Sequence, residues 1–289
     1  ASSAPRDRQE CPTEENPGID RPAIGKGPRQ IMATIPGQWN TARGAENRVF
    51  RIAGCALAGT AAAVFAAFAL VMALDPFDYP VETHLHVAVM TTWLGLFAVQ
   101  ALLATGGDIA LHRRLGMAGG LLAICIAVSG SIVAVSAIAG ERIPPIFSPG
   151  YFLVMTHMDL VAFTGLVAFA LAQRRRSEWH KRLMLCALLA LYEPVLGRVF
   201  LLLLVPALGG PQSALPLLAA NTGAFEAARC LVHCALLAGL ALWDWRATGR
   251  LHRAWLPGLL AIGSIYAVSA LLGAQEAVSA FAVAIAGGV

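Results

Sequence analysis

Residues 115–140 read LGMAGGLLAICIAVSGSIVAVSAIAG, a stretch of 26 residues without a single charge. A helix rises about 1.5 Å per residue, so this stretch is long enough to cross the ~30 Å hydrocarbon core of a bilayer. Inside lipid the backbone groups can hydrogen-bond only to one another, which requires a helix. The stretch therefore predicts a membrane-spanning helix and sets the fold class.

Apolar stretches of similar length recur on both sides of it. They cover residues 52–74, 87–107, 151–172, 183–205, 221–243 and 254–275. We therefore expect an all-α fold, a polytopic membrane helix bundle with seven transmembrane helices in residues 49–275. Residues 276–289 are too short to span, and predict either a short interfacial helix or a continuation of the seventh span.

The composition agrees with this class. The chain of 289 residues is 57% hydrophobic and 13% charged, and its mean hydropathy is +0.67. A soluble domain is nearer one quarter charged, so an ordinary soluble enzyme, a disordered protein and a disulfide-stapled secreted domain are excluded. The net charge of +4 is too small to predict a nucleic-acid partner. The expected partner is the lipid bilayer.

Residues 1–48 differ from the rest of the chain. They hold six of the 16 prolines, mixed charges and no apolar period. Such a composition buries too little apolar surface to fold, so we expect a disordered cytoplasmic segment. Met32 opens a more ordinary stretch, and a mis-assigned translation start for residues 1–31 is left open.

The distribution of Lys and Arg predicts the orientation in the membrane. Eight lie in the N-terminal segment through Arg51, and ten lie in the connections after the second, fourth and sixth spans. Those ten are Arg113 and Arg114; Arg174, Arg175, Arg176, Lys181 and Arg182; and Arg246, Arg250 and Arg253. The opposite loops carry one, Arg142. The positive-inside rule then predicts a bacterial inner-membrane protein with a cytoplasmic N-terminus and a periplasmic C-terminus.

These three connections also share a sequence pattern. They read LHRRL at 111–115, WHKRL at 179–183 and LHRAW at 251–255, spaced by 68 and 72 residues. A repeat of this length is one helical hairpin, so we expect three related hairpins after the first helix. The alternative is that each His-Arg pair only anchors its helix in the headgroup layer.

Polar side chains inside the spans are the candidates for function, because each ionised one costs roughly 2.5–3.5 kcal/mol to insert. They are His157, Asp159, Glu193, Arg198, Glu226, Arg229 and His233. Two hypotheses stay open. The charges pair and hold the helices together, or they form an outer polar cavity for an anionic or quinone-like ligand, or for a haem whose propionates meet Arg198 and Arg229. Pro194 predicts a local break in its helix. No metal-site motif is found.

The histidines support a more specific hypothesis. Either His84 or His86 lies toward the outer side together with His157, and His112 and His180 lie toward the inner side; His86 is the candidate ligand of the two. Each pair could supply the two imidazoles of a haem, and two haems would form an electron path across the membrane. The layout of residues 84–180 resembles the two-haem transmembrane cytochromes b of the ascorbate-reducible kind. That resemblance implies haem b as cofactor, and a quinone, small reductant or redox partner.

In their short sequence motifs, residues 84–275 resemble a family of uncharacterised multi-pass inner-membrane proteins of bacteria. The matching elements are the turn His112–Gly116, the turn Trp179–Leu183, and Glu193-Pro194 with Arg198. This resemblance implies a topology and leaves enzymatic activity undecided. A b-type haem electron-transfer protein is the favoured hypothesis. The alternatives are a carrier or small-ligand-binding protein that uses the outer cavity, or a non-catalytic accessory subunit.

Overall fold

The computed structural model describes residues 36–73 and 79–288, and within these ranges the chain is helical and has no strand. The elements, in chain order, are α1 (Pro36–Ala73), α2 (Val81–Gly106), α3 (Ile109–Ala139), α4 (Pro149–Ala172), α5 (Ser177–Ala190), α6 (Glu193–Ala207), α7 (Pro211–Ala220), α8 (Thr222–Thr248), the 3-10 turn η1 (Arg253–Trp255), α9 (Leu256–Gly273) and α10 (Glu276–Ala286).

The predicted all-α membrane bundle is confirmed, and its fifth span is broken. Six helices are long and apolar enough to cross a bilayer, and α5 with α6 makes a seventh span if the bent pair is counted as one. The pair bends by 43°. Pro194 lies at the start of α6. It has no N–H for the carbonyl one turn earlier, and its ring clashes with that carbonyl, so a continuous helix cannot form.

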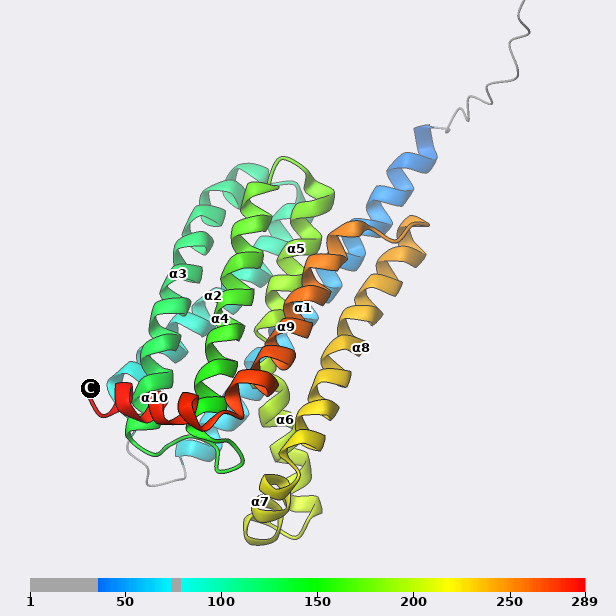
Figure 1. Ribbon diagram of the computed structural model, residues 1–289. Coiled ribbons are helices and arrows are strands. Elements are labelled where there is room, and N and C mark those ends of the chain that lie inside the picture. Colours follow the sequence, from blue (N-terminus) through cyan, green and yellow to red (C-terminus); the bar gives the residue numbers. More distant parts are fainter. Residues whose placement is uncertain (1–35, 74–78, 289) are drawn as a thin grey trace, which may run out of the picture.

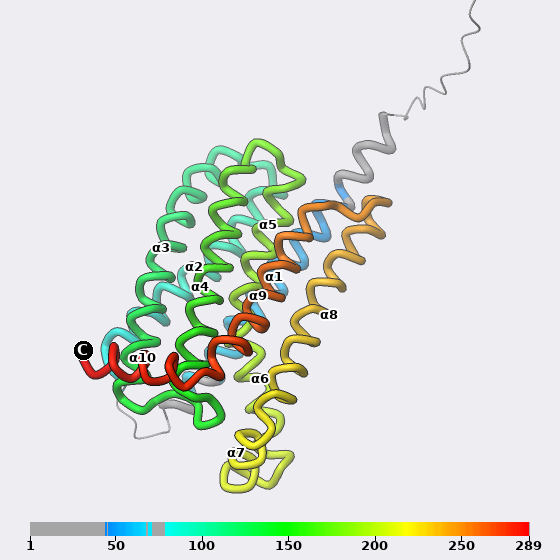
Figure 2. The backbone as a smooth tube through the Cα atoms, viewed as in Figure 1, coloured from blue at the N-terminus to red at the C-terminus, as the bar shows by residue number. Residues whose placement is uncertain are grey.

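The helices stand side by side with their connections gathered at two ends (Figure 1). The connections α2–α3, α4–α5 and α8–η1 lie toward the top of the view, and we call this the basic end. The loops between α3 and α4, and from α6 through α7 to α8, lie at the bottom, which we call the outer end. The tube view shows α10 running across the lower ends of α3 and α4 (Figure 2), on which it packs.

Two boundaries differ from the sequence predictions. The expectation that residues up to 48 form no regular structure is wrong for residues 36–48, which belong to α1. The segment is held near Glu46, whose carboxylate contacts Lys181 and Arg182 on α5, and such tertiary contacts outweigh a weak local pattern. Residues 1–35 of the expected segment lie outside the described residues. The expected outer loop 206–220 contains the short helix α7.

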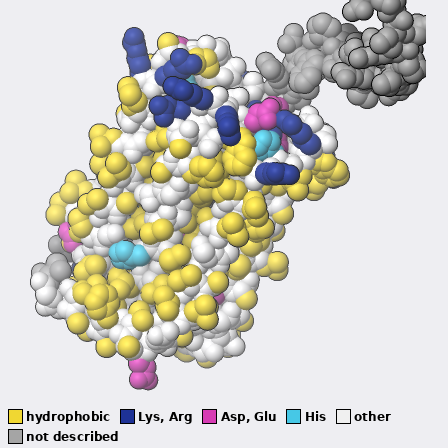
Figure 3. All heavy atoms as spheres, turned by 45° about the horizontal axis from the view of Figure 1, so that its top comes forward, with side chains coloured by type: hydrophobic (Ala, Val, Ile, Leu, Met, Phe, Trp, Pro, Cys, Tyr) yellow, Lys and Arg dark blue, Asp and Glu magenta, His cyan; other side chains and the backbone are white. Residues whose placement is uncertain are grey.

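The core lies around α5, where all residues from Leu185 to Ala190 are buried. Trp93 of α2 meets Phe163 of α4 edge to face, with ring centroids 5.0 Å apart. The outward face of α3 is a continuous apolar stripe. Its members Leu121, Ile124, Val128 and Ile132 are 51–64% exposed, as expected for side chains that face lipid. Figure 3 shows hydrophobic side chains over the flank and Lys and Arg gathered at the basic end.

Candidate functional site

The inner histidine pair lies at the basic end, where α3 and α5 begin. The rings of His112 and His180 have centroids 6.2 Å apart and are nearly perpendicular, at 86°. His180 Nδ1 lies 2.8 Å from the carbonyl oxygen of Ala170. His112 Nδ1 and Gln100 Oε1 are buried without a hydrogen-bond partner among the described residues. The structure therefore brings this predicted pair together.

The outer histidines border one interior region between α2, α3 and α4. A Cβ at Gly130 would lie 3.3 Å from His86 Cε1 and 2.9 Å from Leu160 Cδ2. His157 precedes Leu160 by three residues, so both side chains lie on the same face of α4. In the described part of the chain no ring contact joins His86 and His157, and the Leu160 side chain lies beside Gly130 together with His86.

Each outer histidine is anchored at Nδ1. His86 Nδ1 lies 2.9 Å from the Ser129 hydroxyl, and His157 Nδ1 lies 2.8 Å from the carbonyl oxygen of Leu153. A histidine that binds a metal usually donates its other ring N–H to such a group. The Nδ1 anchoring of His86, His157 and His180 is the kind found in haem-binding histidines, whereas His112 Nδ1 has no such partner among the described residues and a side chain occupies the space beside His86.

A second polar group surrounds Arg229 of α8, which is 1% exposed. Its guanidinium contacts the Glu193 carboxylate and the Glu226 carboxylate, the latter at 2.5 Å, and it donates to the Glu193 carbonyl at 3.1 Å. We call Glu193, Glu226, Arg229 and Asp159 the carboxylate cluster, since Asp159 also interacts electrostatically with Arg229. The shared face of Glu226, Arg229 and His233 predicted from their spacing is buried.

His233 is fixed beside this cluster by two hydrogen bonds. Its Nε2 lies 2.7 Å from the Leu189 carbonyl oxygen and its Nδ1 lies 3.3 Å from the Tyr266 hydroxyl. A carbonyl oxygen only accepts, so Nε2 carries the proton and Nδ1 accepts from Tyr266. This arrangement needs no charge on His233.

Arg198 of α6 makes contacts that reach toward α1 and α2. It donates to the Pro194 carbonyl at 2.9 Å, and its guanidinium lies 4.9 Å from the centre of the Phe65 ring. Its charge also acts on His86. The hypothesis that Glu193, Arg198, Glu226 and Arg229 form one group is therefore supported for three of the four, while Arg198 belongs with the outer histidine.

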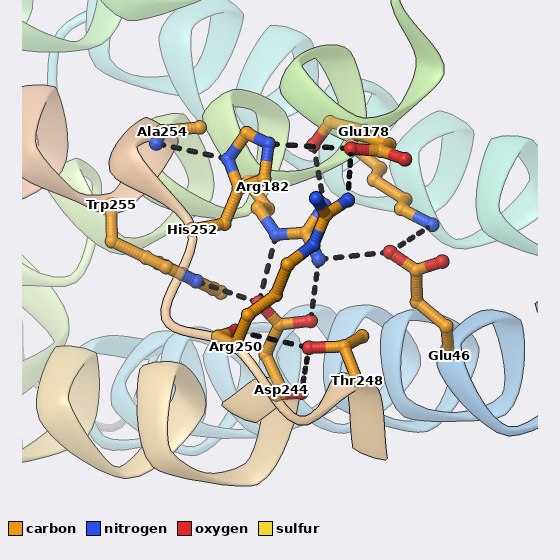
Figure 4. Close-up of polar contacts among 10 residues, drawn as sticks. Glu46, Glu178, Arg182, Asp244, Thr248, Arg250, His252, Ala254 and Trp255 are labelled. Carbon is orange, nitrogen blue, oxygen red and sulfur yellow. Dashed lines mark hydrogen bonds and ion pairs between the residues drawn. The ribbon is translucent and has the colours of Figure 1, made fainter. Parts of the chain in front are cut away.

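The basic end holds a polar network that the sequence did not predict (Figure 4). Arg182, 1% exposed, donates from Nε and Nη2 to both oxygens of Asp244, at 2.8 and 2.7 Å. It also donates to Glu46 Oε1 at 2.8 Å and to the Glu178 carbonyl at 2.7 Å. The Trp255 indole donates to Asp244 at 2.9 Å. This clamp joins α1, α5, α8 and η1.

His252 caps the same network from the connection between α8 and η1. Its Nδ1 accepts the Ala254 N–H at 3.1 Å, and its Nε2 lies 3.5 Å from Glu178. Burial and then the Arg182 charge lower the pKa of His252, and Arg250 adds to this, while the carboxylates of Glu178 and Asp244 oppose it. The folded state thus favours the neutral ring.

Two surface cavities adjoin these groups. One, of about 440 Å³, lies at the outer end and is lined by Phe147 and Tyr151 among others. The other, of about 250 Å³, lies at the basic end beside Trp179 and His252. Neither is lined by the four candidate haem ligands.

Apolar spans, a lipid-facing flank and one basic end define a polytopic integral membrane protein of the helical class. Comparison of the chain with known protein families, with curated proteins and with solved structures gives no match in any of the three.

Proposed function

We propose that the protein is a b-type haem electron-transfer protein of the bacterial inner membrane. His86 and His157 would hold one haem and His112 and His180 the other, so that electrons could cross between the two faces. A haem iron held in this way carries one electron at a time.

The observation that carries the proposal is the anchoring of the candidate ligands. His86, His157 and His180 each use Nδ1 in a hydrogen bond of 2.8–2.9 Å. This leaves Nε2 of each ring for a metal, as in most histidine-ligated sites.

The inner pair adds a geometric argument. His112 and His180 come from the starts of two different helices and would together hold the iron of the inner haem. The rings of His112 and His180 are separated by 6.2 Å. Arg113 and Arg114 beside this pair, and Arg198 near the outer pair, offer positive charge to the carboxylate groups that a haem carries.

The test is an optical spectrum of protein purified from cells with ample haem. We expect a b-type α-band in the reduced-minus-oxidised difference spectrum. His180→Leu and His86→Leu should each remove about half of the haem per protein, because each removes one ligand of one pair. His84→Leu is the matched control, since His84 is exposed and lies two residues from His86. A colourless wild type, or unchanged spectra in both ligand variants, would refute the proposal.

The orientation is part of the proposal, and the charge distribution supports it. Eighteen Lys and Arg residues lie in the N-terminal segment and in the three connections of the basic end, and by the positive-inside rule this supports a cytoplasmic location for that end. Reporter fusions after residue 176 and after residue 209 test this. The first should report the cytoplasm and the second the periplasm, and the opposite result would invert the topology.

A carrier of small ligands is the second candidate function. It is favoured by the carboxylate cluster, where Asp159 is 6% exposed and its Oδ1 has no hydrogen-bond partner among the described residues. Proton flux into proteoliposomes, followed with a pH-sensitive dye, tests it. Flux in the wild type that Asp159→Asn abolishes would favour the carrier, and its absence would exclude proton-coupled transport.

A further inference from the structure

The cavity at the outer end is lined by aromatic and small residues close to helix ends. Its volume is about 440 Å³. One wall is the stacked pair Phe147 and Tyr151, with ring centroids 5.3 Å apart and planes at 19°. Ala219 of α7 and Ala274 after α9 also line it. Small apolar and aromatic walls at a span boundary suit a lipid-soluble ring.

Behind this wall lies the carboxylate cluster. The Tyr151 phenol interacts with the Glu226 carboxylate, and Glu226 pairs with Arg229. The Arg229 guanidinium in turn lies 5.9 Å from the centre of the Phe147 ring. Tyr151 thus connects the cavity to the buried charges, and its hydroxyl can both donate and accept.

The charges in the cluster do not balance. Glu193, Glu226 and Asp159 are three carboxyl groups, and Arg229 is the guanidinium that interacts with all of them. Asp159 is 6% exposed, and its unpartnered Oδ1 belongs to a side chain that interacts with Arg229 and Tyr266. An uncompensated buried charge costs several kcal/mol. Because the cluster holds more carboxyl groups than guanidinium groups, we expect it to be a place where protons can bind behind the cavity.

We propose that the outer cavity binds a hydroxyl-bearing aromatic ring, as in a hydroquinone, with the ring against Phe147 and Tyr151. The ring hydroxyl hydrogen-bonds to the Tyr151 hydroxyl, and the carboxylate cluster behind Tyr151 binds and exchanges protons. Binding itself needs nothing beyond this site. That the ring serves as an electron donor rests on the proposed function.

The test is anaerobic calorimetric titration of the purified full-length protein with duroquinol and with its dimethyl ether. The wild type should bind duroquinol about tenfold more tightly than the ether, because the ether cannot donate a hydrogen bond to Tyr151. Tyr151→Phe keeps the stacked ring and should bring duroquinol to the affinity of the ether. Equal affinities in the wild type would overturn the proposal.

Occupation of the cavity is tested by filling it. Ala219→Trp should abolish binding of both compounds, whereas Ala220→Trp, an exposed neighbour outside the lining, should bind as the wild type. Ala274→Trp fills the cavity from a different element, and serves if Ala219→Trp fails to fold. Undiminished binding in a folded filled variant would place the ring elsewhere and overturn the proposal.

The haem spectrum of the same preparations separates the two proposals. A protein that shows the b-type band and binds no duroquinol overturns the cavity proposal alone. A colourless protein that binds duroquinol through Tyr151 overturns the haem proposal alone.

Discussion

Asp244→Ala should strongly destabilise the fold, because it removes the acceptor at the centre of the clamp at the basic end. Asp244 is 0% exposed and accepts two hydrogen bonds from Arg182 and one from Trp255. Removing one partner of a buried ion pair costs about 3–5 kcal/mol, since the other charge stays buried. Arg182 keeps Glu46 at 2.8 Å, so we expect the lower end, about 3 kcal/mol.

The assay is thermal unfolding of the purified protein in detergent. For a domain of this size about 3 kcal/mol lowers Tm by roughly 6–12 °C. Arg250→Ala is the control, because its ion pair with Glu178 is made by side chains that are 63% and 49% exposed. An exposed pair contributes about 0–1 kcal/mol, so Tm should change little.

An isosteric variant separates charge from volume. Asp244→Asn keeps the side-chain size and one acceptor oxygen, so it should lose less than Asp244→Ala, about 1.5–3 kcal/mol. If Asp244→Ala lowers Tm no more than Arg250→Ala does, the clamp contributes nothing to stability and the reasoning is refuted.

Three further outcomes follow from other contacts. Since the fold lowers the pKa of His252, native stability should fall as pH drops from about 6.5 toward that lowered pKa. His252→Asn, whose side chain can still cap the turn, should flatten the curve of Tm against pH. An unchanged curve would show that the His252 imidazole does not cause the pH dependence. Gly273→Ala puts a Cβ 2.6 Å from the α4 backbone and should lower the free energy of unfolding by about 1–3 kcal/mol, measured by thermal unfolding. Gly263→Ala is the control, because a Cβ there meets nothing within 4 Å and should leave the stability unchanged. Equal effects of the two variants would contradict the close approach at Gly273. Asp159→Asn changes a carboxyl whose Oδ1 has no hydrogen-bond donor among the described residues, and should leave Tm unchanged or raised. Glu193→Gln weakens an ion pair and should lower the free energy of unfolding by about 1.5–3 kcal/mol, seen as a lower Tm; the reverse order would show that Asp159 is the paired acid.

The spans could be predicted from the sequence because lipid imposes a simple rule: every backbone group is satisfied within its own helix. The break at Pro194 could also be predicted, because a proline lacks the N–H that the helix needs at that position. The common face of Glu226, Arg229 and His233 follows from helical spacing alone. Each of these inferences uses information within one turn or one span of the chain.

The partners of the charges could not be predicted in the same way. Arg182 and Asp244 are separated by 62 residues and lie at span ends, where charges normally face water or headgroups. Arg198 and Arg229 look alike in sequence, yet only the rotation of α6 and α8 within the bundle decides which one meets Glu193. The sequence identified Asp159, Glu193 and Glu226 as acids inside three spans, but which cation each one meets depends on tertiary packing.

The break between α5 and α6 has a consequence for how the protein can vary. The carbonyls of Leu189 and Glu193 flank the break and accept from His233 and Arg229 of α8. A straight fifth span would direct the Leu189 carbonyl to the N–H of Glu193 four residues later and weaken it as the acceptor for the buried His233, whereas Arg229 would keep the carboxylates of Glu193 and Glu226. Relatives that lack Pro194 should therefore more often lack His233 as well, while Arg229 should vary with the two glutamates.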